Sequence, residues 1–275
     1  MKAVAKTIGV ARSHLHDKVY RAKKPRGPYR KLEDETLVQL VRRIADERPT
    51  YGYRRITALA NRELAKAGEP SVNHKRVFRI MRQNAMLLAR HTGRRTGRVH
   101  DGKVIVMRSN LRWCSDGFEI SCWNGDLIRI AFIIDAHDRE IIAWHAVVGS
   151  GISGGMVRDM MLEAVERRFG ALKSPAPLEW LTDNGSAYTA KATRDFATAL
   201  NLIACFTPVQ SPESNCMSES FVKTFKRDYV RVNPLPDAFT ALGKLAGWFE
   251  DYNENHPHSG LKMRSPREFI RAQAQ

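Results

Sequence analysis

The chain has 275 residues, of which 43% are hydrophobic and 8% aromatic, enough to fill the core of one large or two smaller domains. No apolar run reaches the roughly 18 residues of a membrane-spanning helix, and the basic first residues lack the apolar block of a signal peptide. The four cysteines form no C-x-x-C pair, which argues against a zinc ribbon or a disulfide framework. We therefore expect a cytoplasmic protein with reduced thiols and no membrane partner.

The net charge of +16 is concentrated in the first part of the chain. Residues 1–108 carry 27 Lys and Arg against 9 Asp and Glu, whereas residues 109–275 carry 18 against 20. Lys and Arg that neutralise phosphates release condensed counterions, so a nucleic acid is the expected partner. A solvated basic surface, a ribosomal role or an anionic membrane surface are the alternatives. The acidic balance of the second part argues against them and indicates a domain whose carboxylates have another task.

The basic part divides into three segments. Residues 1–30 are expected to hold a partial helix-turn-helix, with Gly9 at its turn, followed by a basic linker that contains two prolines. Residues 31–90 place apolar side chains at helical spacing and predict a helical domain of three helices; its helix-turn-helix-like, DNA-binding character is what the family resemblance described below implies. Residues 91–108 have many cations and no apolar period, so we expect a second linker there.

The third of these helices is a candidate DNA-facing element. It would place four cations largely on one side: Lys75, Arg76, Arg79 and Arg82. An ordinary solvated helix face is the alternative interpretation of the same pattern.

After residue 109 the apolar pattern changes from helical to extended. An Asn-Gly pair within 121–135 is a strong signal for a hairpin turn. Strands are expected at 112–120, on both sides of that turn, and at 140–149, 178–183 and 202–207, with helices at 156–170, 189–201, 215–232 and 238–255. This order predicts an α/β layered domain over residues 109–275 whose first strands are antiparallel.

Three carboxylates in this domain occupy positions that call for a partner. Asp116 lies inside an apolar strand, Asp183 ends a short strand before a tight turn, and Glu219 lies in a helix. An unpaired buried carboxylate is costly, so three that converge favour a divalent cation, and oxygen ligands favour Mg²⁺ or Mn²⁺. Lys223 and Lys226 follow Glu219 at i+4 and i+7, as expected beside a phosphate-binding site. Alternatively, each acid is a helix cap, a salt-bridge partner or an exposed residue.

The same residues carry a family resemblance. Asp116, Asp183 and Glu219, with 35 residues between the last two, resemble the DDE triad of retroviral-integrase-like transposases. RWCSDGF, LTDNGSAY, SPESNCMSESFVKTFKRDY and YNENHPHSGLKMRSPREF resemble motifs of bacterial insertion-sequence transposases that are encoded in two overlapping frames. YGYRRI and VNHKRVFRIMRQN resemble the helix-turn-helix region that precedes their catalytic domain. The resemblance covers about residues 40–270.

The resemblance implies a fold, a reaction and a set of partners. The fold is a ribonuclease H-like mixed sheet with flanking helices, preceded by an all-α helix-turn-helix region, in the second-frame (OrfB) component. The implied reaction is DNA strand cleavage by water and strand transfer by a DNA 3′-hydroxyl, with two Mg²⁺ or Mn²⁺ ions held by the three acids. The implied partners are the inverted-repeat ends of the element, target DNA, a first-frame component or fusion, and further copies of the chain. The residues expected to contact DNA are Lys223, Lys226, Arg54, Arg55, Lys75, Arg76 and Arg79.

Two other functions stay open at this point. A DNA-binding regulator with an inactive integrase-like domain would explain the basic part, and a ribonuclease H-type nuclease would share the fold and the metal ions. The sequence also departs from the family at Cys216, where Gly or Ala is usual, and at residues 260–263, where Gly-Leu-Lys-Met replaces Ala-Leu-Gly-Tyr.

Two further groups are candidates for metal binding. Asp135 ends a predicted strand, where it would be either a further metal ligand or the cap of the following turn. His256 and His258 flank a proline and would either bind zinc or, with the neighbouring asparagines, pack or contact DNA.

Overall fold

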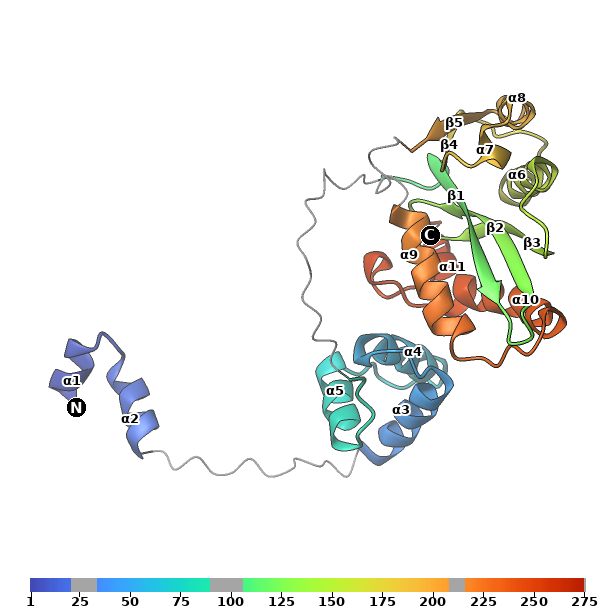
Figure 1. Ribbon diagram of the computed structural model, residues 1–275. Helices are drawn as coiled ribbons and strands as arrows, with labels where there is room; N and C mark the ends of the chain where they lie inside the picture. The colour runs from blue at the N-terminus through green and yellow to red at the C-terminus, as the bar shows by residue number, and fades with distance from the viewer. Residues whose placement is uncertain (21–33, 90–105, 208–215, 275) are drawn as a thin grey trace.

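The computed structural model describes residues 1–20, 34–89, 106–207 and 216–274. These ranges form a pair of short helices, a helical domain of residues 34–89 and a sheet domain of residues 106–274 (Figure 1). In the described ranges, no helix combines the length and the apolar character needed to cross a membrane.

The two N-terminal helices meet at a glycine turn. Helix α1 spans Lys2–Thr7 and helix α2 spans Arg12–Tyr20. Gly9, between them, has φ +66°, a left-handed conformation that glycine adopts without a steric penalty. The predicted turn at Gly9 is confirmed.

The helical domain contains the three predicted helices, α3 (Glu35–Glu47), α4 (Tyr53–Lys66) and α5 (His74–Gln83). Each contributes apolar residues at helical spacing to one buried cluster: Leu37, Val41, Ile44, Ile56, Ala60, Val77, Ile80 and Met81. Asn73 caps α5, because its side-chain oxygen accepts a hydrogen bond from the backbone N–H of Lys75 at 2.9 Å.

The sheet domain is built on five strands in the order β3-β2-β1-β4-β5. The strands β1 (Arg112–Ser121), β2 (Leu127–Asp135) and β3 (Ile141–Val148) form the predicted antiparallel meander. The strands β4 (Leu178–Thr182) and β5 (Leu202–Phe206) extend the sheet in parallel with β1. The mixed α/β sheet expected from the sequence is confirmed.

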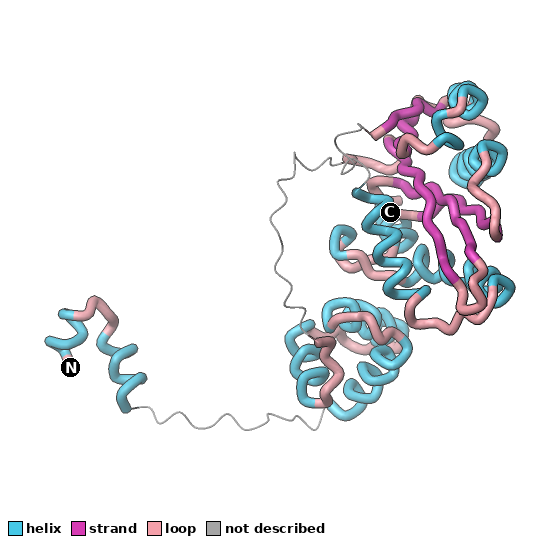
Figure 2. The backbone as a smooth tube through the Cα atoms, in the orientation of Figure 1, coloured by secondary structure: helices cyan, strands magenta, loops and turns pink. Residues whose placement is uncertain are grey.

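Helices cover both faces of this sheet (Figure 2). One face is covered by α6 (Gly154–Phe169), α7 (Ser186–Thr189) and α8 (Lys191–Ala199), and the other by α9 (Cys216–Phe225), the π-helix η3 (Lys226–Val230) and α10 (Ala238–Asn255). Strand β2 contributes side chains to the cores on both faces of the sheet, because successive side chains on a strand point to opposite faces. Ile130 and Phe132 pack with the α9 and α10 side, whereas Ala131 and Ile133 pack with the α6 and α8 side.

The chain departs from the expected elements in three places. The single helix expected over 215–232 is divided into α9 and η3. The helix expected over 189–201 is present as α8, and the short helix α7, which was not expected, precedes it. A final helix, α11 (Pro266–Gln273), follows the 3₁₀ turn η4 (Ser259–Leu261) and begins with a capping box. In that box Ser265 and Glu268 each bond the other's backbone N–H.

Candidate active site

Strand register brings Asp116 and Asp183 to the same level of the sheet. Strands β1 and β4 pair in parallel up to Cys114 opposite Leu181. Asp116 and Asp183 each lie two residues further along, Asp183 just past the carboxyl end of β4. The parallel pairing therefore places Asp116, in the middle of β1, level with Asp183, just past the carboxyl end of β4.

Glu219 approaches from the helix that packs against β1. It lies in the first turn of α9, where Phe221 and Phe225 point into the core. The ring of Phe221 lies 4.6 Å from that of Phe132, and the ring of Phe225 lies 5.6 Å from that of Phe118. These aromatic contacts fix α9 on the sheet and leave Glu219 about half exposed, at 47%.

The three carboxylates interact electrostatically. The pKa of Asp116 is raised to about 6, mainly by burial and also by the charges of Asp183 and Glu219, while the hydrogen bond from the backbone N–H of Gly117 opposes the shift. The ionised form of such a carboxylate is destabilised in this environment, and a nearby cation would stabilise it. The acids are therefore close enough to repel one another, and their oxygens are of the kind that bind Mg²⁺ or Mn²⁺.

Each of these acids also has a local hydrogen-bond donor. Asp116 accepts from the N–H of Gly117 at 2.8 Å, Asp183 from the N–H of Gly185 at 3.0 Å, and Glu219 from Lys223 Nζ at 3.2 Å. Within the described residues, no three acid, histidine or cysteine side chains are arranged to hold one metal ion. Each of the three carboxylates is thus turned toward its own local donor.

Gly185 and Tyr188, which lie beside Asp183, also belong to the site. Neither is acidic, so the pattern of carboxylates in the sequence did not predict them. A Cβ on Gly185 would lie 3.0 Å from Asp183 Oδ1, so the glycine lets the carboxylate fold back over the turn. Tyr188 is buried against Trp180, with ring centroids 5.8 Å apart. Burial raises its pKa, and the charges of Asp116 and Asp183 contribute in the same direction. Both residues belong to the LTDNGSAY motif.

The two lysines after Glu219 have different surroundings. Lys223 is 78% exposed and forms an ion pair with Glu219. Lys226 begins the π-helix, and its Nζ lies 5.9 Å from the centroid of the Phe118 ring. The expected placement beside Glu219 holds for Lys223, while Lys226 lies over the aromatic core next to it.

Among the cations of the helical domain, Arg54 and Lys75 are exposed. The guanidinium of Arg54 lies over the ring of Tyr53, at 5.4 Å from its centroid. Lys75 lies in the first turn of α5. Both are placed where DNA can reach them.

The other three helical-domain cations predicted to bind DNA have acidic partners. Arg76 pairs with Asp34 at 2.7 Å, and Arg79 pairs with the same carboxylate. Arg55 pairs at 3.0 Å with Asp228 of the sheet domain. A helical pattern identifies the face of a helix but not these partners, which lie far away in the sequence.

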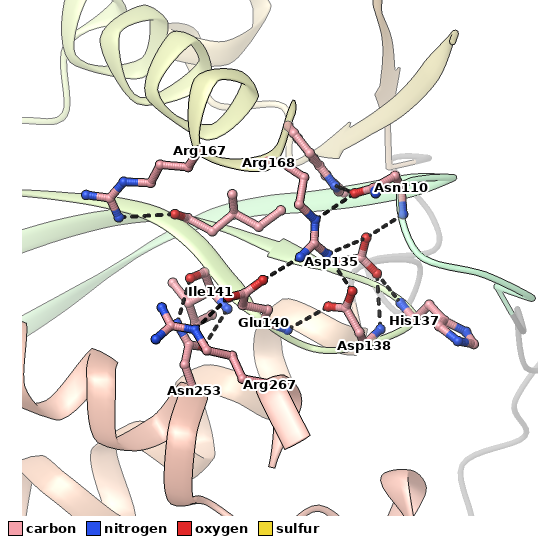
Figure 3. Close-up of polar contacts among 12 residues, drawn as sticks. Asn110, Asp135, His137, Asp138, Glu140, Ile141, Arg167, Arg168, Asn253 and Arg267 are labelled. Atoms are coloured by element: carbon pink, nitrogen blue, oxygen red, sulfur yellow. Dashed lines mark hydrogen bonds and ion pairs between the residues drawn. The ribbon is translucent and has the colours of Figure 1, made fainter. Parts of the chain in front are cut away.

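Asp135 caps a turn, as one of the two alternatives predicted (Figure 3). Its carboxylate is fully buried and accepts from the backbone N–H groups of Asn110 (2.7 Å), His137 (2.7 Å) and Asp138 (3.1 Å). Arg168 adds an ion pair at 3.4 Å. These partners use the oxygens that a metal ligand would need.

The two histidines of the YNENHPHS motif are buried structural residues. His256 is fully buried, and its Nδ1 lies 2.7 Å from the hydroxyl of Tyr51 in the helical domain. Burial lowers the pKa of His258 to about 3. Both rings are therefore uncharged near neutral pH, and the packing alternative is confirmed for them.

Comparisons with known families and proteins agree with this arrangement. The chain matches the family described as HTH-like domain over residues 31–95, and the family described as integrase core domain over residues 107–212 and 204–266. It is 51% identical to the transposase InsD of insertion element IS2 from Escherichia coli over 246 residues, covering 89% of this chain and 81% of InsD. It is 69% identical over 194 residues to an uncharacterized protein of insertion element IS136 from Agrobacterium fabrum, covering 70% of this chain and all of that protein.

Solved structures with a similar chain path include a simian T-cell lymphotropic virus intasome and the catalytic domain of Mos1 mariner transposase. The first has a TM-score of 0.48 and 17% identity, and the match covers 76% of this chain and 69% of that one. The second has a TM-score of 0.44 and 16% identity, and the match covers 60% of this chain and 81% of that one.

The fold and the family matches define a class of enzyme, the DDE polynucleotidyl transferases with a ribonuclease H-like core. The chain belongs to the family of bacterial insertion-sequence transposases that includes InsD, and it corresponds to the second-frame catalytic component. It is a DNA-binding transposase that moves an insertion sequence by strand cleavage and strand transfer, and its family uses divalent metal ions.

Proposed function

We propose that Asp116, Asp183 and Glu219 are the catalytic residues of this transposase and jointly hold two Mg²⁺ or Mn²⁺ ions. The observation that carries the proposal is the electrostatic coupling at Asp116, whose pKa is raised to about 6 by burial and by the charges of the other two acids. Such a cluster has too little positive charge of its own. A divalent cation supplies the missing charge and polarises the scissile phosphate.

The side chains of the site have separate tasks in this reaction. The exposed carboxylate of Asp183 meets DNA that approaches the sheet edge from solvent, while Asp116 lies deeper on β1. Lys223 and Lys226 attract the phosphates on either side of the reacting one. Water is the nucleophile for cleavage and a DNA 3′-hydroxyl for strand transfer, in both cases by direct in-line displacement.

The helical domain supplies binding to the element's own ends. The concentration of positive charge before residue 109 and the exposed Arg54 and Lys75 support contact with the terminal inverted repeats. Arg76 and Arg79 contribute where DNA competes with Asp34 for them. A first-frame component or fusion partner and further copies of this chain complete the assembly on DNA. This substrate places the protein in the bacterial cytoplasm, on the nucleoid.

The proposal is tested with a labelled duplex that carries one terminal inverted repeat of the element. With Mg²⁺ or Mn²⁺, the wild-type chain with its first-frame partner is expected to cut at the repeat end and join it to target DNA. Asp183→Asn keeps the side-chain volume but removes the charge, so cleavage and joining should fall at least about a thousandfold with DNA affinity nearly unchanged.

Asp195→Asn is the matched control, because Asp195 is an exposed aspartate of the same domain that pairs with Lys191 on the same helix. This variant should keep wild-type activity. Undiminished joining by Asp183→Asn would refute the assignment. Cleavage of an RNA:DNA hybrid in place of the duplex would identify a ribonuclease H-type nuclease instead.

A further inference from the structure

The helical domain and the sheet domain meet in a contact rich in buried polar groups. The guanidinium of Arg48, at the end of α3, binds both carboxylate oxygens of Asp251 on α10, one of them at 2.7 Å. The hydroxyl of Tyr229 donates to the same carboxylate at 2.9 Å. A two-pronged pair of this kind fixes orientation as well as distance.

Asp228 is the centre of this contact. Its side chain is 1% exposed, and it accepts hydrogen bonds from both domains. The hydroxyl of Thr50 donates to it at 2.6 Å and Arg55 at 3.0 Å, both from the helical domain, while Arg227 donates from its own side. A buried carboxylate with three donors is not easily separated from them, because an unpaired charge would remain.

Tyr51 fills the space between these two ion pairs. It is 3% exposed and lies between the guanidinium groups of Arg48 and Arg55, at 5.8 and 5.1 Å from its ring centroid. Its hydroxyl meets His256 Nδ1 at 2.7 Å. Further along, Arg62 binds the carboxylate of Glu268, the residue that closes the capping box of α11.

This interdomain contact is joined directly to the helix that carries Glu219. Helix α9 continues without a break into the π-helix η3, which contains Asp228. Figure 1 shows α9 extending from the sheet toward the helical domain. The wider turn of the π-helix is closed by the bond from Arg231 N to Lys226 O at 2.9 Å. A shift of the helical domain is thus transmitted to α9.

We propose that Tyr51 and Asp228 are positioning residues for strand cleavage: they hold the DNA-binding surface of the helical domain at a fixed place relative to Asp116, Asp183 and Glu219. The inference rests on the proposed catalytic role of those acids. The contact turns two domains into one unit, so DNA bound at Arg54 and Lys75 reaches the site in one register. Arg55 serves this unit through Asp228 rather than through DNA.

The proposal is tested by mapping, at single-nucleotide resolution, where the enzyme cuts the terminal-repeat duplex. Tyr51→Phe removes only the hydroxyl that meets His256, and Asp228→Asn removes the central charge. Each variant should bind the duplex within about twofold of wild type, because the DNA-facing side chains are untouched. Cleavage at the correct phosphate should fall on the order of tenfold to a hundredfold, with new cuts at neighbouring phosphates.

Thr50 offers a matched pair of milder changes. Thr50→Ser keeps the hydroxyl that donates to Asp228, whereas Thr50→Val keeps the shape and loses the donor. The serine variant should cut like wild type and the valine variant should spread its cuts, even if Asp228→Asn fails to fold. A further control, Glu63→Gln, removes the charge of one of the two acidic partners of Arg43, away from the interdomain contact, and should leave the cleavage position and rate unchanged.

The possible outcomes separate this inference from the proposed function. A single, correct cleavage position at the wild-type rate in Tyr51→Phe and Thr50→Val would overturn the inference while leaving the catalytic assignment intact. Persistent cleavage by Asp183→Asn would instead overturn the catalytic assignment, whatever the positions of the cuts. Parallel loss of DNA affinity and cleavage, without new cut positions, would also count against a positioning role.

Discussion

The sheet domain contains two clusters of three acids that differ in their positive charge. The arginine-centred cluster consists of Asp135, Asp138 and Glu140 around Arg168 (Figure 3), and the active-site cluster consists of Asp116, Asp183 and Glu219. Arg168 pairs with all three acids of the first, and Arg267 adds a second contact to Glu140 at 2.8 Å. Among the residues that the structure describes, the ion pair of the second cluster is the one between the exposed Lys223 and Glu219.

This difference separates structural carboxylates from those available for chemistry. In the arginine-centred cluster the oxygens of Asp135 already bind backbone N–H groups and Arg168. This carboxylate therefore stabilises a turn. In the active-site cluster the structure describes one local donor for each acid, and Asp116 has a raised pKa. Burial alone does not identify a catalytic acid, since Asp135 is the more buried of the two. A shortage of positive charge beside the acids, within the described residues, is what distinguishes the active-site cluster from the arginine-centred cluster.

Removing the central arginine is the change with the largest expected effect on stability. Arg168→Met keeps much of the side-chain volume but leaves three carboxylates, two of them fully buried, without their shared cation. The free energy of unfolding should fall by about 3 to 5 kcal/mol, as measured by urea denaturation. Arg194→Met, at an exposed position of α8, should change it by less than about 0.5 kcal/mol. Equal stability of the two variants would remove the distinction between the clusters.

Removing a charge from the active-site cluster should instead raise the free energy of unfolding. The pKa of Asp116 is raised from an ordinary 3.8 to about 6, so the folded chain binds the proton more tightly than the unfolded chain. Stability is therefore lost as the pH rises from about 4 to 6, and the loss is complete above pH 6. Asp116→Asn removes this penalty, and without divalent cations it should raise the free energy of unfolding by about 2 to 3 kcal/mol at pH 8.

The pH dependence provides the check on this gain. At pH 4 Asp116 is largely protonated in the folded wild-type chain and partly protonated in the unfolded chain. The stability advantage of Asp116→Asn over wild type should therefore nearly vanish. Asp195→Asn, whose aspartate is exposed and paired with Lys191, should show no such dependence. Added Mg²⁺ should stabilise the wild-type chain and not Asp116→Asn. A gain of the same size at both pH values would show that the charge of Asp116 is not its cause.

Sequence patterns predicted the elements of the sheet domain because its strands alternate or run apolar, and because Asn124 and Gly125 mark the hairpin turn. The same patterns placed Asp116 and Asp183 at strand positions that the register brings level. They did not predict the π-helix after α9, since its residues have ordinary helical propensities. The sequence predicted that Arg55 contacts DNA. The helical pattern does not reveal its ion-pair partner, because Asp228 is 173 residues away in the chain.

The smallest expected effect tests how closely the active-site cluster depends on the shape of its turn. Gly185→Ala would place a Cβ 3.0 Å from Asp183 Oδ1, tighter than an ordinary contact, so the carboxylate must rotate away. Because Asp183 lies at the surface, stability should change by less than about 1 kcal/mol, whereas cleavage should fall about tenfold. Gly155→Ala is the matched control, since its Cβ would meet its nearest neighbour at 3.7 Å. If both variants cut at the wild-type rate, the carboxylate of Asp183 tolerates displacement. The active-site cluster would then depend less on exact side-chain placement than the arginine-centred cluster does.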